Sequence, residues 1–226
     1  MHPSRDLNMS NISLVETAVQ ATSLADRAYV AIRDLIVSLE LPPGSLIDER
    51  RLVERLGIGR TPVREALRRL AQEQLVEVFP RRGMFVTKVD VRDLARISEV
   101  RAVLEPEAAR LAAERATDEE RDDLASFGDQ IRRGADLMAL DERIHRAVYA
   151  AAHNDLLEKT LGEFYVLAQR IWMIALDRAE DLEDAVEAHR DLIQQIVVGN
   201  GDGAAEVMRA HVENFEQAMH KVLVTV

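Results

Sequence analysis

Four side chains in the C-terminal half of the chain have the types and spacing of a metal-binding set. Asp141 and His145 are four residues apart, so on a helix both project from one face about one turn apart. His189 and His211 lie ten residues before and ten residues after the turn at 199–201. That turn would make the two flanking helices antiparallel neighbours and bring both histidines to the same height. Three imidazoles and one carboxylate are therefore expected to meet inside a helical bundle.

This ligand set suits a divalent transition metal ion: zinc, nickel, cobalt, manganese or iron. Four protein ligands leave two positions open on an octahedral ion, and these can accept a carboxylate or hydroxyl group of a small organic acid. The ligand types do not distinguish zinc, nickel and manganese from one another. His153, beside Asn154 at a helix end, and His220, near the C-terminus, lack such partners, and we expect both to be turn or surface residues.

A second group of residues, between Ser45 and Lys88, has the pattern of a nucleic-acid contact surface. Arg60, Arg64 and Arg68 recur every fourth residue along one side of a predicted helix. The opposite side of this helix carries its apolar residues: Val63, Ala66, Leu67 and Leu70. An outward row of guanidinium groups suits DNA phosphates and base edges. The alternative for these arginines alone is an ordinary solvated basic helix.

The elements around this helix predict a helix-turn-helix. Asp48 can cap a short first helix, and Gly57 stands where a left-handed stop is expected. A turn follows at 58–59. Thr61 can cap the second helix, with Pro62 at its first position, where the missing N–H costs nothing.

A predicted hairpin follows the second helix. Leu75 to Phe79 and Met84 to Lys88 have the pattern of short strands, joined by a turn at Pro80-Arg81-Arg82-Gly83. Two helices followed by such a wing form the unit that places a recognition helix in the major groove and a basic loop against the backbone or minor groove.

Charge is distributed unequally along the chain. The net charge is -11, but from Ser45 to Lys88 ten basic residues exceed six acidic ones, whereas from Val91 to Val226 there are 16 basic and 28 acidic residues. This asymmetry indicates a nucleic-acid module joined to an acidic domain with another task. The chain has no cysteine, which excludes disulfides, thiolate catalysis and cysteine-ligated metal.

The rest of the layout predicts a mainly α protein with two domains. No apolar run is long enough for a membrane helix, and the N-terminus lacks a basic region followed by an apolar core, so we expect a cytoplasmic protein that contacts no membrane. A helix is predicted at 24–41, and six amphipathic helices with short connections predict an all-helical antiparallel bundle. Their predicted ranges are 93–116, 118–133, 136–152, 155–177, 181–199 and 202–223. The expected division is a flexible tail at 1–22, a winged helix-turn-helix domain at 23–90 and the helical domain at 91–226.

The segment PPGSLIDERRLVERLGIGRTPVREALRRL at 42–70 resembles the winged DNA-binding domain of GntR-type bacterial transcription regulators. The helical part resembles the FCD (FadR C-terminal) effector-binding domain of the FadR subfamily. That second resemblance rests on VRAVLEPEAARLAA at 100–113, DERIH at 141–145, AHRDLI at 188–193 and MRAH at 208–211. Six rather than seven helices after the linker make the chain more similar to the VanR-like branch than to the fatty-acyl-CoA-sensing one, which lacks the metal set.

The resemblance implies a homodimer that binds operator DNA and a helical domain that senses a metabolite, often a carboxylate held partly by a bound metal. By motif, Asp141, His145, His189 and His211 fill the family's metal positions. The implied DNA-contacting residues are Arg50, Arg60, Thr61, Arg64, Arg81, Arg82 and Gly83. Arg101 and Asn154 match positions that face the effector cavity in relatives; the alternatives are a helix-surface arginine and a helix-cap asparagine.

These observations favour a metabolite-responsive transcription regulator, usually a repressor in such families, rather than an enzyme. One alternative is a metal-dependent hydrolase or lyase, because a metal centre with open positions can activate water. Against it, no residue beside the four ligands has the spacing of a general base or nucleophile. Another alternative is an architectural DNA-binding protein without a small ligand, for which the acidic, histidine-bearing domain has no use.

Overall fold

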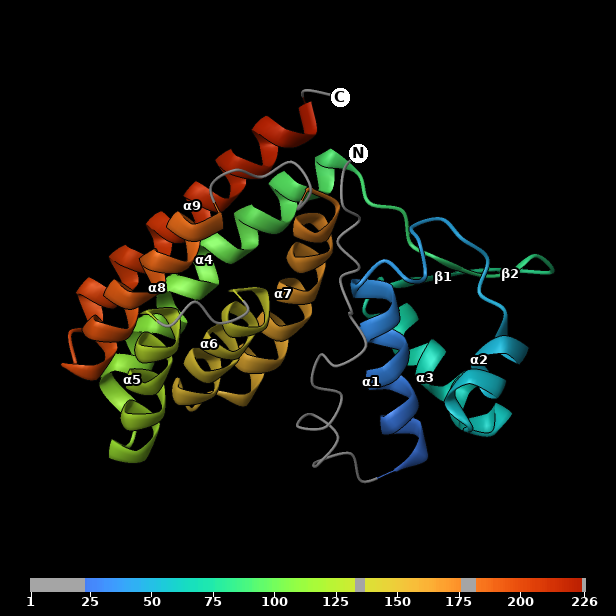
Figure 1. Ribbon diagram of the computed structural model, residues 1–226, viewed down its shortest axis with the longest axis horizontal. Coiled ribbons are helices and arrows are strands. Elements are labelled where there is room, and N and C mark those ends of the chain that lie inside the picture. The colour runs from blue at the N-terminus through green and yellow to red at the C-terminus, as the bar shows by residue number, and fades with distance from the viewer. Residues whose placement is uncertain (1–22, 133–136, 176–181, 225–226) are drawn as a thin grey trace, which may run out of the picture. The chain divides into compact units, whose positions relative to one another are not determined.

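The computed structural model describes residues 23–132, 137–175 and 182–224. The chain divides into two compact units, and the division falls between Lys88 and Val89. We call them the winged unit and the helical unit (Figure 1). The tail predicted at 1–22 lies outside the described residues.

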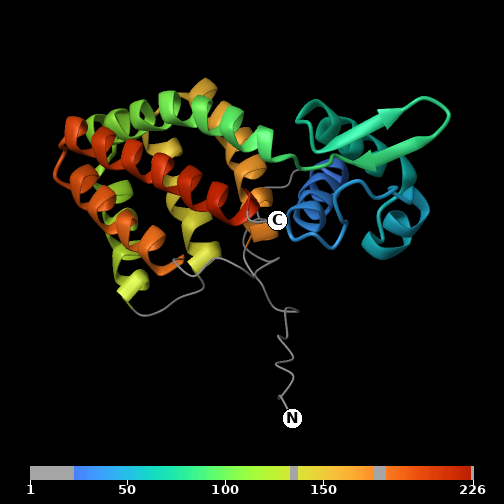
Figure 2. The ribbon, with the colours of Figure 1, turned by 90° about the horizontal axis from the view of Figure 1, so that it is seen from above.

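From residue 23 onward, where the structure describes it, the winged unit contains three helices followed by a two-stranded hairpin. The elements are α1 (Leu24–Val37), α2 (Glu49–Leu56), α3 (Arg60–Gln72), β1 (Val76–Phe79) and β2 (Gly83–Val86). Figure 2 shows the two strands side by side. They are antiparallel, with Val76 paired to Val86 and Phe79 to Gly83 at the tip.

Helix α1 packs against α3 through its apolar face and is shorter than predicted. Ala28, Ile32, Leu35 and Ile36 are buried on this face. The periodic pattern predicted a helix to residue 41, but α1 ends at Val37. Leu39 has a φ of 62°, a left-handed conformation that cannot continue an α-helix.

The ends of α2 agree with the sequence, whereas the start of α3 differs. Asp48 caps α2 by accepting hydrogen bonds from the backbone N–H groups of Arg50 and Arg51, and Gly57 ends it with a φ of 63°. Helix α3 begins at Arg60, and its N-cap is Gly59, not Thr61. Pro62 is therefore the third helical residue, where its missing N–H would still have no partner within the helix.

The part of the helical unit that the structure describes contains six helices. They are α4 (Val91–Arg115), α5 (Asp118–Arg132), α6 (Leu137–Ala151), α7 (Asp155–Ala175), α8 (Leu182–Val197) and α9 (Gly201–Val224). Figures 1 and 2 show α9 lying along α4, with α8 beside α9. The predicted fold class, mainly α with a winged helix-turn-helix followed by a helical domain, is confirmed.

Helix α4 forms much of the core of this unit. A capping box fixes its start, in which the side chains of Asp90 and Asp93 each accept a hydrogen bond from the other's backbone N–H. Buried alanines at 108, 109, 112 and 113 let α4 approach its neighbours closely. Pro106 lies inside α4 and removes one intrahelical hydrogen bond.

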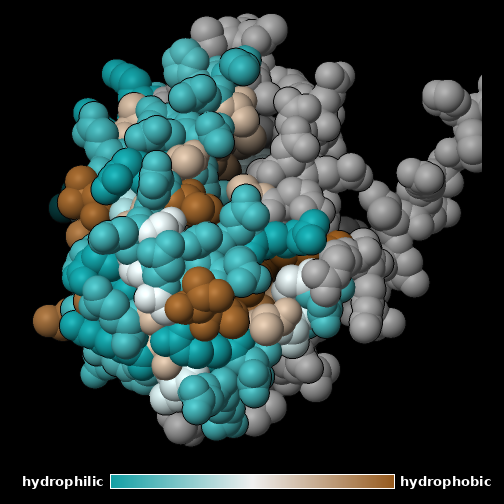
Figure 3. Space-filling view, turned by 90° about the vertical axis from the view of Figure 1, so that its left-hand side faces the viewer, coloured by the Kyte–Doolittle hydropathy of each residue, from teal (hydrophilic) through white to brown (hydrophobic). Residues whose placement is uncertain are grey.

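The surface in Figure 3 is mostly hydrophilic, with small separate hydrophobic areas. Within the described parts of the chain, no helix combines the length and apolar character needed to cross a membrane.

Candidate functional site

The helical unit brings together the four side chains of the predicted metal-binding set. Asp141 and His145 come from α6, His189 from α8 and His211 from α9. One ligand atom from each residue lies within 4.8 Å of the others, and all four residues are buried. The turn at 199–201 joins α8 to α9, so the two distant histidines meet as the symmetric spacing predicted.

Three of the distances between these atoms are those expected for neighbouring ligands of one ion, and a fourth, from His145 Nε2 to Asp141 Oδ1, is longer at 4.0 Å. His145 Nε2 is 3.2 Å from His189 Nε2 and 3.3 Å from His211 Nε2, and Asp141 Oδ1 is 3.4 Å from His189 Nε2. Donors about 2.1 Å from a common ion, at angles of about 90–110°, are about 3.0–3.4 Å apart. The donor set and its geometry therefore suit a divalent transition metal ion.

Neighbouring groups orient His145 toward the other ligands. Its Nδ1 is 3.1 Å from the Tyr149 hydroxyl and 3.4 Å from Glu105 Oε2. An ionised carboxylate only accepts hydrogen bonds, so a proton on Nδ1 would face Glu105 and leave the lone pair of Nε2 directed at the other ligands. A carboxylate behind a histidine ligand is a common feature of metal sites.

Glu105 is kept ionised although it is fully buried. Burial by itself raises the pKa of this carboxyl, but the positive charge of Arg101, its hydrogen bond and the neighbouring His145 ring outweigh burial, so the pKa of Glu105 lies far below its usual range. Arg101 Nε donates to Glu105 Oε1 at 2.5 Å, four residues away on the same face of α4. Arg101 also stacks on the ring of Phe215, 5.2 Å from its centroid.

Neighbouring groups orient Asp141 and favour the neutral form of His211. Tyr165 donates to Asp141 Oδ2 at 2.6 Å, which leaves Oδ1 facing the histidines. Burial, reinforced by repulsion from His189 and His145, lowers the pKa of His211 well below its usual value. A neutral imidazole and an oriented carboxylate oxygen are the states that coordinate.

Arg101 and Asn154 have different surroundings. Arg101 is 2% exposed beside the four-residue set, so it is not a helix-surface arginine. Asn154 is exposed at the start of α7, where its Oδ1 accepts a hydrogen bond from the backbone N–H of Leu157. This is the capping role, and an effector contact by Asn154 stays a prediction. His153 and His220 are exposed, as expected.

Glu105, Tyr149 and Tyr165 were not singled out from the sequence. The spacing in the sequence could have indicated two of them. Glu105 follows Arg101 by four residues and Tyr149 follows His145 by four, and this spacing places each pair on one helix face. No sequence spacing indicated Tyr165, because it contacts Asp141 from another helix.

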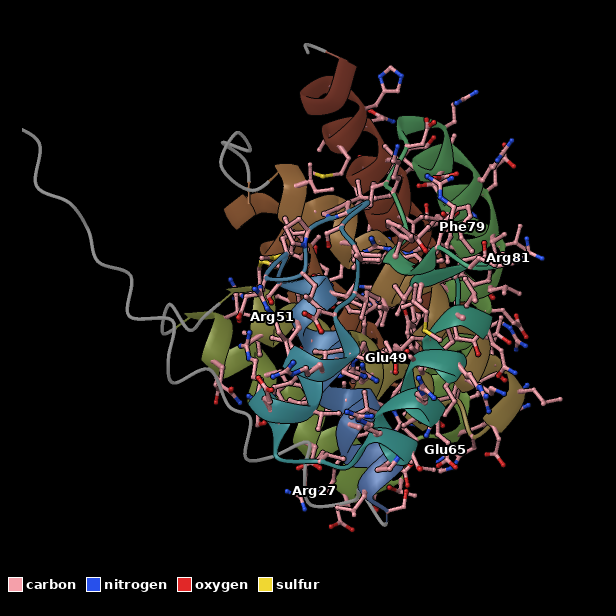
Figure 4. All side chains as sticks on the ribbon, turned by 90° about the vertical axis from the view of Figure 1, so that its right-hand side faces the viewer. Arg27, Glu49, Arg51, Glu65, Phe79 and Arg81 are labelled. Carbon is pink, nitrogen blue, oxygen red and sulfur yellow. The ribbon has the colours of Figure 1, made fainter. Side chains whose placement is uncertain are left out.

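The predicted DNA-contacting side chains are exposed on the winged unit. Arg60, Thr61 and Arg64 lie in the first five residues of α3, and Arg50 lies in α2. Arg81, Arg82 and Gly83 form the hairpin tip, where Arg81 and Gly83 have positive φ. Figure 4 shows Arg81 pointing outward. Two of the arginines have acidic partners: Arg50 Nε is 3.0 Å from Glu54, and Arg64 Nε is 2.6 Å from Glu49.

Both units match known protein families. Residues 24–86 match the model of bacterial regulatory proteins of the gntR family, and residues 96–214 match the FCD domain. This chain belongs to the GntR family of bacterial regulatory proteins. The GntR match covers the helix-turn-helix and the hairpin, and the FCD match covers all four residues of the metal-binding set.

Relatives of this GntR-family protein are named as transcription regulators. It is 30% identical over 187 residues to an HTH-type transcriptional regulator in an unstable DNA locus of Streptomyces ambofaciens, covering 81% of this chain and 79% of that protein. It is 25% identical to the HTH-type transcriptional repressor RspR of Escherichia coli, covering 92% and 94% of the two chains. A probable D-xylose utilization operon transcriptional repressor of Paenarthrobacter nicotinovorans is 30% identical, with 80% and 84% covered.

A solved structure shows the same fold. The E. coli protein McbR/YncC superimposes with a TM-score of 0.79 at 21% identity, covering 88% of this chain and 98% of that one. The two family matches and the names of the relatives identify this protein as a transcription regulator of the GntR family with an FCD effector-binding domain.

Proposed function

We propose that this protein is a metabolite-responsive repressor of the FadR subfamily, VanR-like branch. It acts in the cytoplasm as a homodimer on a palindromic operator. In this proposal the winged unit contacts DNA through α3 and the hairpin tip, and the helical unit holds a divalent metal ion and a small carboxylate effector. The repressor names of two relatives support the direction of regulation.

The convergence of Asp141, His145, His189 and His211 carries the effector part of the proposal. Burying such a set on three helices without a ligand lowers the stability of the fold, because the imidazole nitrogens and the carboxylate lose their hydration. Four protein ligands leave open positions on an octahedral ion. A small oxygen-donor molecule fills such positions.

The charges around this set favour an anionic effector. A divalent ion together with Arg101, Glu105 and Asp141 leaves one net positive charge in a buried region. An anion that enters there neutralises this charge in a low-dielectric surrounding, where electrostatic attraction is strong. A carboxylate therefore suits the site better than a neutral sugar or a cation.

The connection between the units provides a route to regulation. Strand β2 ends at Val86 and α4 begins at Val91, so only a few residues join the hairpin to the helix that bears Arg101 and Glu105. In a dimer, each recognition helix must reach a half-site whose spacing is set by the helical repeat of DNA. A change in α4 on effector binding can then alter operator affinity.

The test begins with elemental analysis of protein purified without chelators or nickel resin, followed by thermal-shift screening of small carboxylic acids. An operator duplex is obtained by selecting DNA that binds from a randomised pool. Calorimetric titration of the best acid, with and without this duplex, should give two affinities that differ by about 5- to 150-fold, and linkage requires the acid to change DNA affinity by the same factor. Equal affinities for an acid that binds the metal would reject regulation by that acid.

The same preparation addresses the hydrolase or lyase alternative. Incubation of the metal-loaded protein with the acids that bind it, followed by product analysis, should show no turnover. The names of the relatives and both family matches favour regulation over catalysis.

A further inference from the structure

A carboxylate on α2 holds one of the outward arginines of α3. Glu49 is the first residue of α2, and its Oε2 accepts a hydrogen bond from Arg64 Nε at 2.6 Å. The pair links the two helices of the helix-turn-helix. The side chain of Glu49 is 30% exposed and that of Arg64 59%, so the pair lies at the surface with Arg64 outermost.

The contact uses only one edge of the guanidinium group. Glu49 binds the Nε edge, and the group still carries two terminal amino groups on the other edge. Bidentate recognition of guanine N7 and O6 uses two parallel N–H donors from one guanidinium. A carboxylate that fixes Nε presents these terminal donors in one orientation before DNA arrives.

We infer that Glu49 is a specificity-determining positioning residue, which aims Arg64 at a base edge and disfavours binding to other DNA. The inference rests on the proposed role of Arg64 in DNA recognition. A negative charge beside a DNA-binding surface repels phosphates in every sequence. Only the sequence that accepts the oriented arginine offsets this repulsion, so Glu49 increases the ratio of operator affinity to non-specific affinity.

The capped start of α2 holds the backbone of Glu49 in one position relative to α3. Asp48 caps α2 through the N–H groups of Arg50 and Arg51, and Gly57 fixes the turn into α3. The Arg50–Glu54 pair differs, because it lies within one helix and both side chains are more than 60% exposed. Such an exposed pair adds little order, and Glu54 does not connect α2 to α3.

The experiment uses the full-length protein, the selected operator duplex and a mixed-sequence duplex, with fluorescence anisotropy at one salt concentration. Glu49→Gln should lower the affinity ratio between the two duplexes by about 5- to 10-fold, part of the discrimination that a bidentate guanine contact provides. Its affinity for the mixed-sequence duplex should rise. Glu49→Asp keeps the charge but is too short for the contact, so it should also lower the ratio. Thermal unfolding confirms that both variants are folded.

Glu65→Gln is the matched control. Glu65 is exposed on α3 next to Arg64 in sequence and forms no ion pair with any described residue (Figure 4). Its substitution removes the same charge from the same surface. Affinity for both duplexes should rise together, and the ratio should stay the same. If Glu65→Gln and Glu49→Gln lowered the ratio of operator to mixed-sequence affinity equally, the effect would come from the lost charge alone, and the inference would be rejected.

A double-mutant cycle with Arg64→Ala separates positioning from direct contact. If Glu49 acts through Arg64, Glu49→Gln has no further effect on the ratio in the Arg64→Ala background. The same loss in both backgrounds would show that Glu49 contacts DNA by itself and would overturn the inference. A normal ratio in Arg64→Ala would instead reject the proposed role of α3, whereas a normal ratio in Glu49→Gln alone rejects only the role of Glu49.

Discussion

His189 and His211 face each other across the α8–α9 hairpin, with ring centroids 4.4 Å apart and ring planes inclined by 61°. Both rings are buried. Their centroids lie 5.1 Å (His189) and 5.2 Å (His211) from the centroid of the His145 ring on α6. Three helices therefore share one cluster of imidazoles, and a metal ion bound there would tie α6, α8 and α9 together.

His189→Ala and His211→Ala should each lose most of the bound metal and the thermal stability that the metal provides. An ion that binds only the folded protein, at about 100 times its Kd, stabilises it by about 2.7 kcal/mol. Metal content by elemental analysis and melting temperature with and without chelator measure both effects. His153→Ala and His220→Ala remove exposed histidines and should change neither. Full metal content in the first two variants would contradict the assignment.

Glu105→Gln should weaken metal binding by about 10- to 100-fold, because the amide no longer provides the carboxylate behind His145. It also leaves Arg101 buried without its partner, which costs about 3–5 kcal/mol of stability. Tyr149→Phe removes the other group at Nδ1 and leaves the ion pair intact, so its metal affinity should fall by less, with a smaller loss of stability. Competition with a chromogenic chelator gives the affinities. Glu107→Gln, on the exposed side of α4, should behave as the wild type.

Arg60→Ala and Arg64→Ala should each weaken specific operator binding while leaving the fold intact. A guanidinium that reads a guanine contributes about 1–3 kcal/mol of discrimination, whereas one that holds phosphate weakens binding evenly across sequences. Titration of operator and mixed-sequence duplexes at several salt concentrations distinguishes these outcomes. Lys159→Ala, which removes an exposed charge from α7, serves as the control. Unchanged operator affinity in both arginine variants would remove α3 from the interface.

Tyr29→Phe should destabilise the winged unit by about 1 kcal/mol at neutral pH, because the Tyr29 hydroxyl donates to Glu73 at 2.7 Å. Burial and then this hydrogen bond raise the pKa of Tyr29 from 10.0 to about 12. The contribution of the hydroxyl is therefore complete below pH 10 and is lost as the pH rises through about 12. Urea unfolding at pH 8, 10 and 11 should show the two proteins becoming more alike. A constant difference would contradict the role of this proton.

The sequence determined the features that depend on a few neighbouring residues. Asp48 and Gly57 mark the ends of α2, because a capping carboxylate and a left-handed glycine act within one turn of their own position. The equal spacing of His189 and His211 about the turn predicted their contact, because residues equally far from the turn lie at the same level along two antiparallel helices. The row of arginines on α3 follows from helical periodicity.

Only the tertiary structure decided which long side chains pair across elements. Tyr165 with Asp141, Glu105 with His145, and Glu49 with Arg64 join residues on different helices. Such pairs depend on the angle and separation of the packed helices, which many distant core contacts set together. The burial of Arg101 has the same origin, because α4 is covered by other helices on the side that bears it.

The start of α3 shows how local signals compete. Thr61 and Pro62 are both favourable near a helix start, but Gly59 takes the extended conformation of the cap and the helix begins at Arg60. Sequence preferences for a cap differ by about 1 kcal/mol or less among suitable residues. The packing of α3 against α1, through fully buried side chains such as Val63 and Leu67, involves larger free energies and so decides the register.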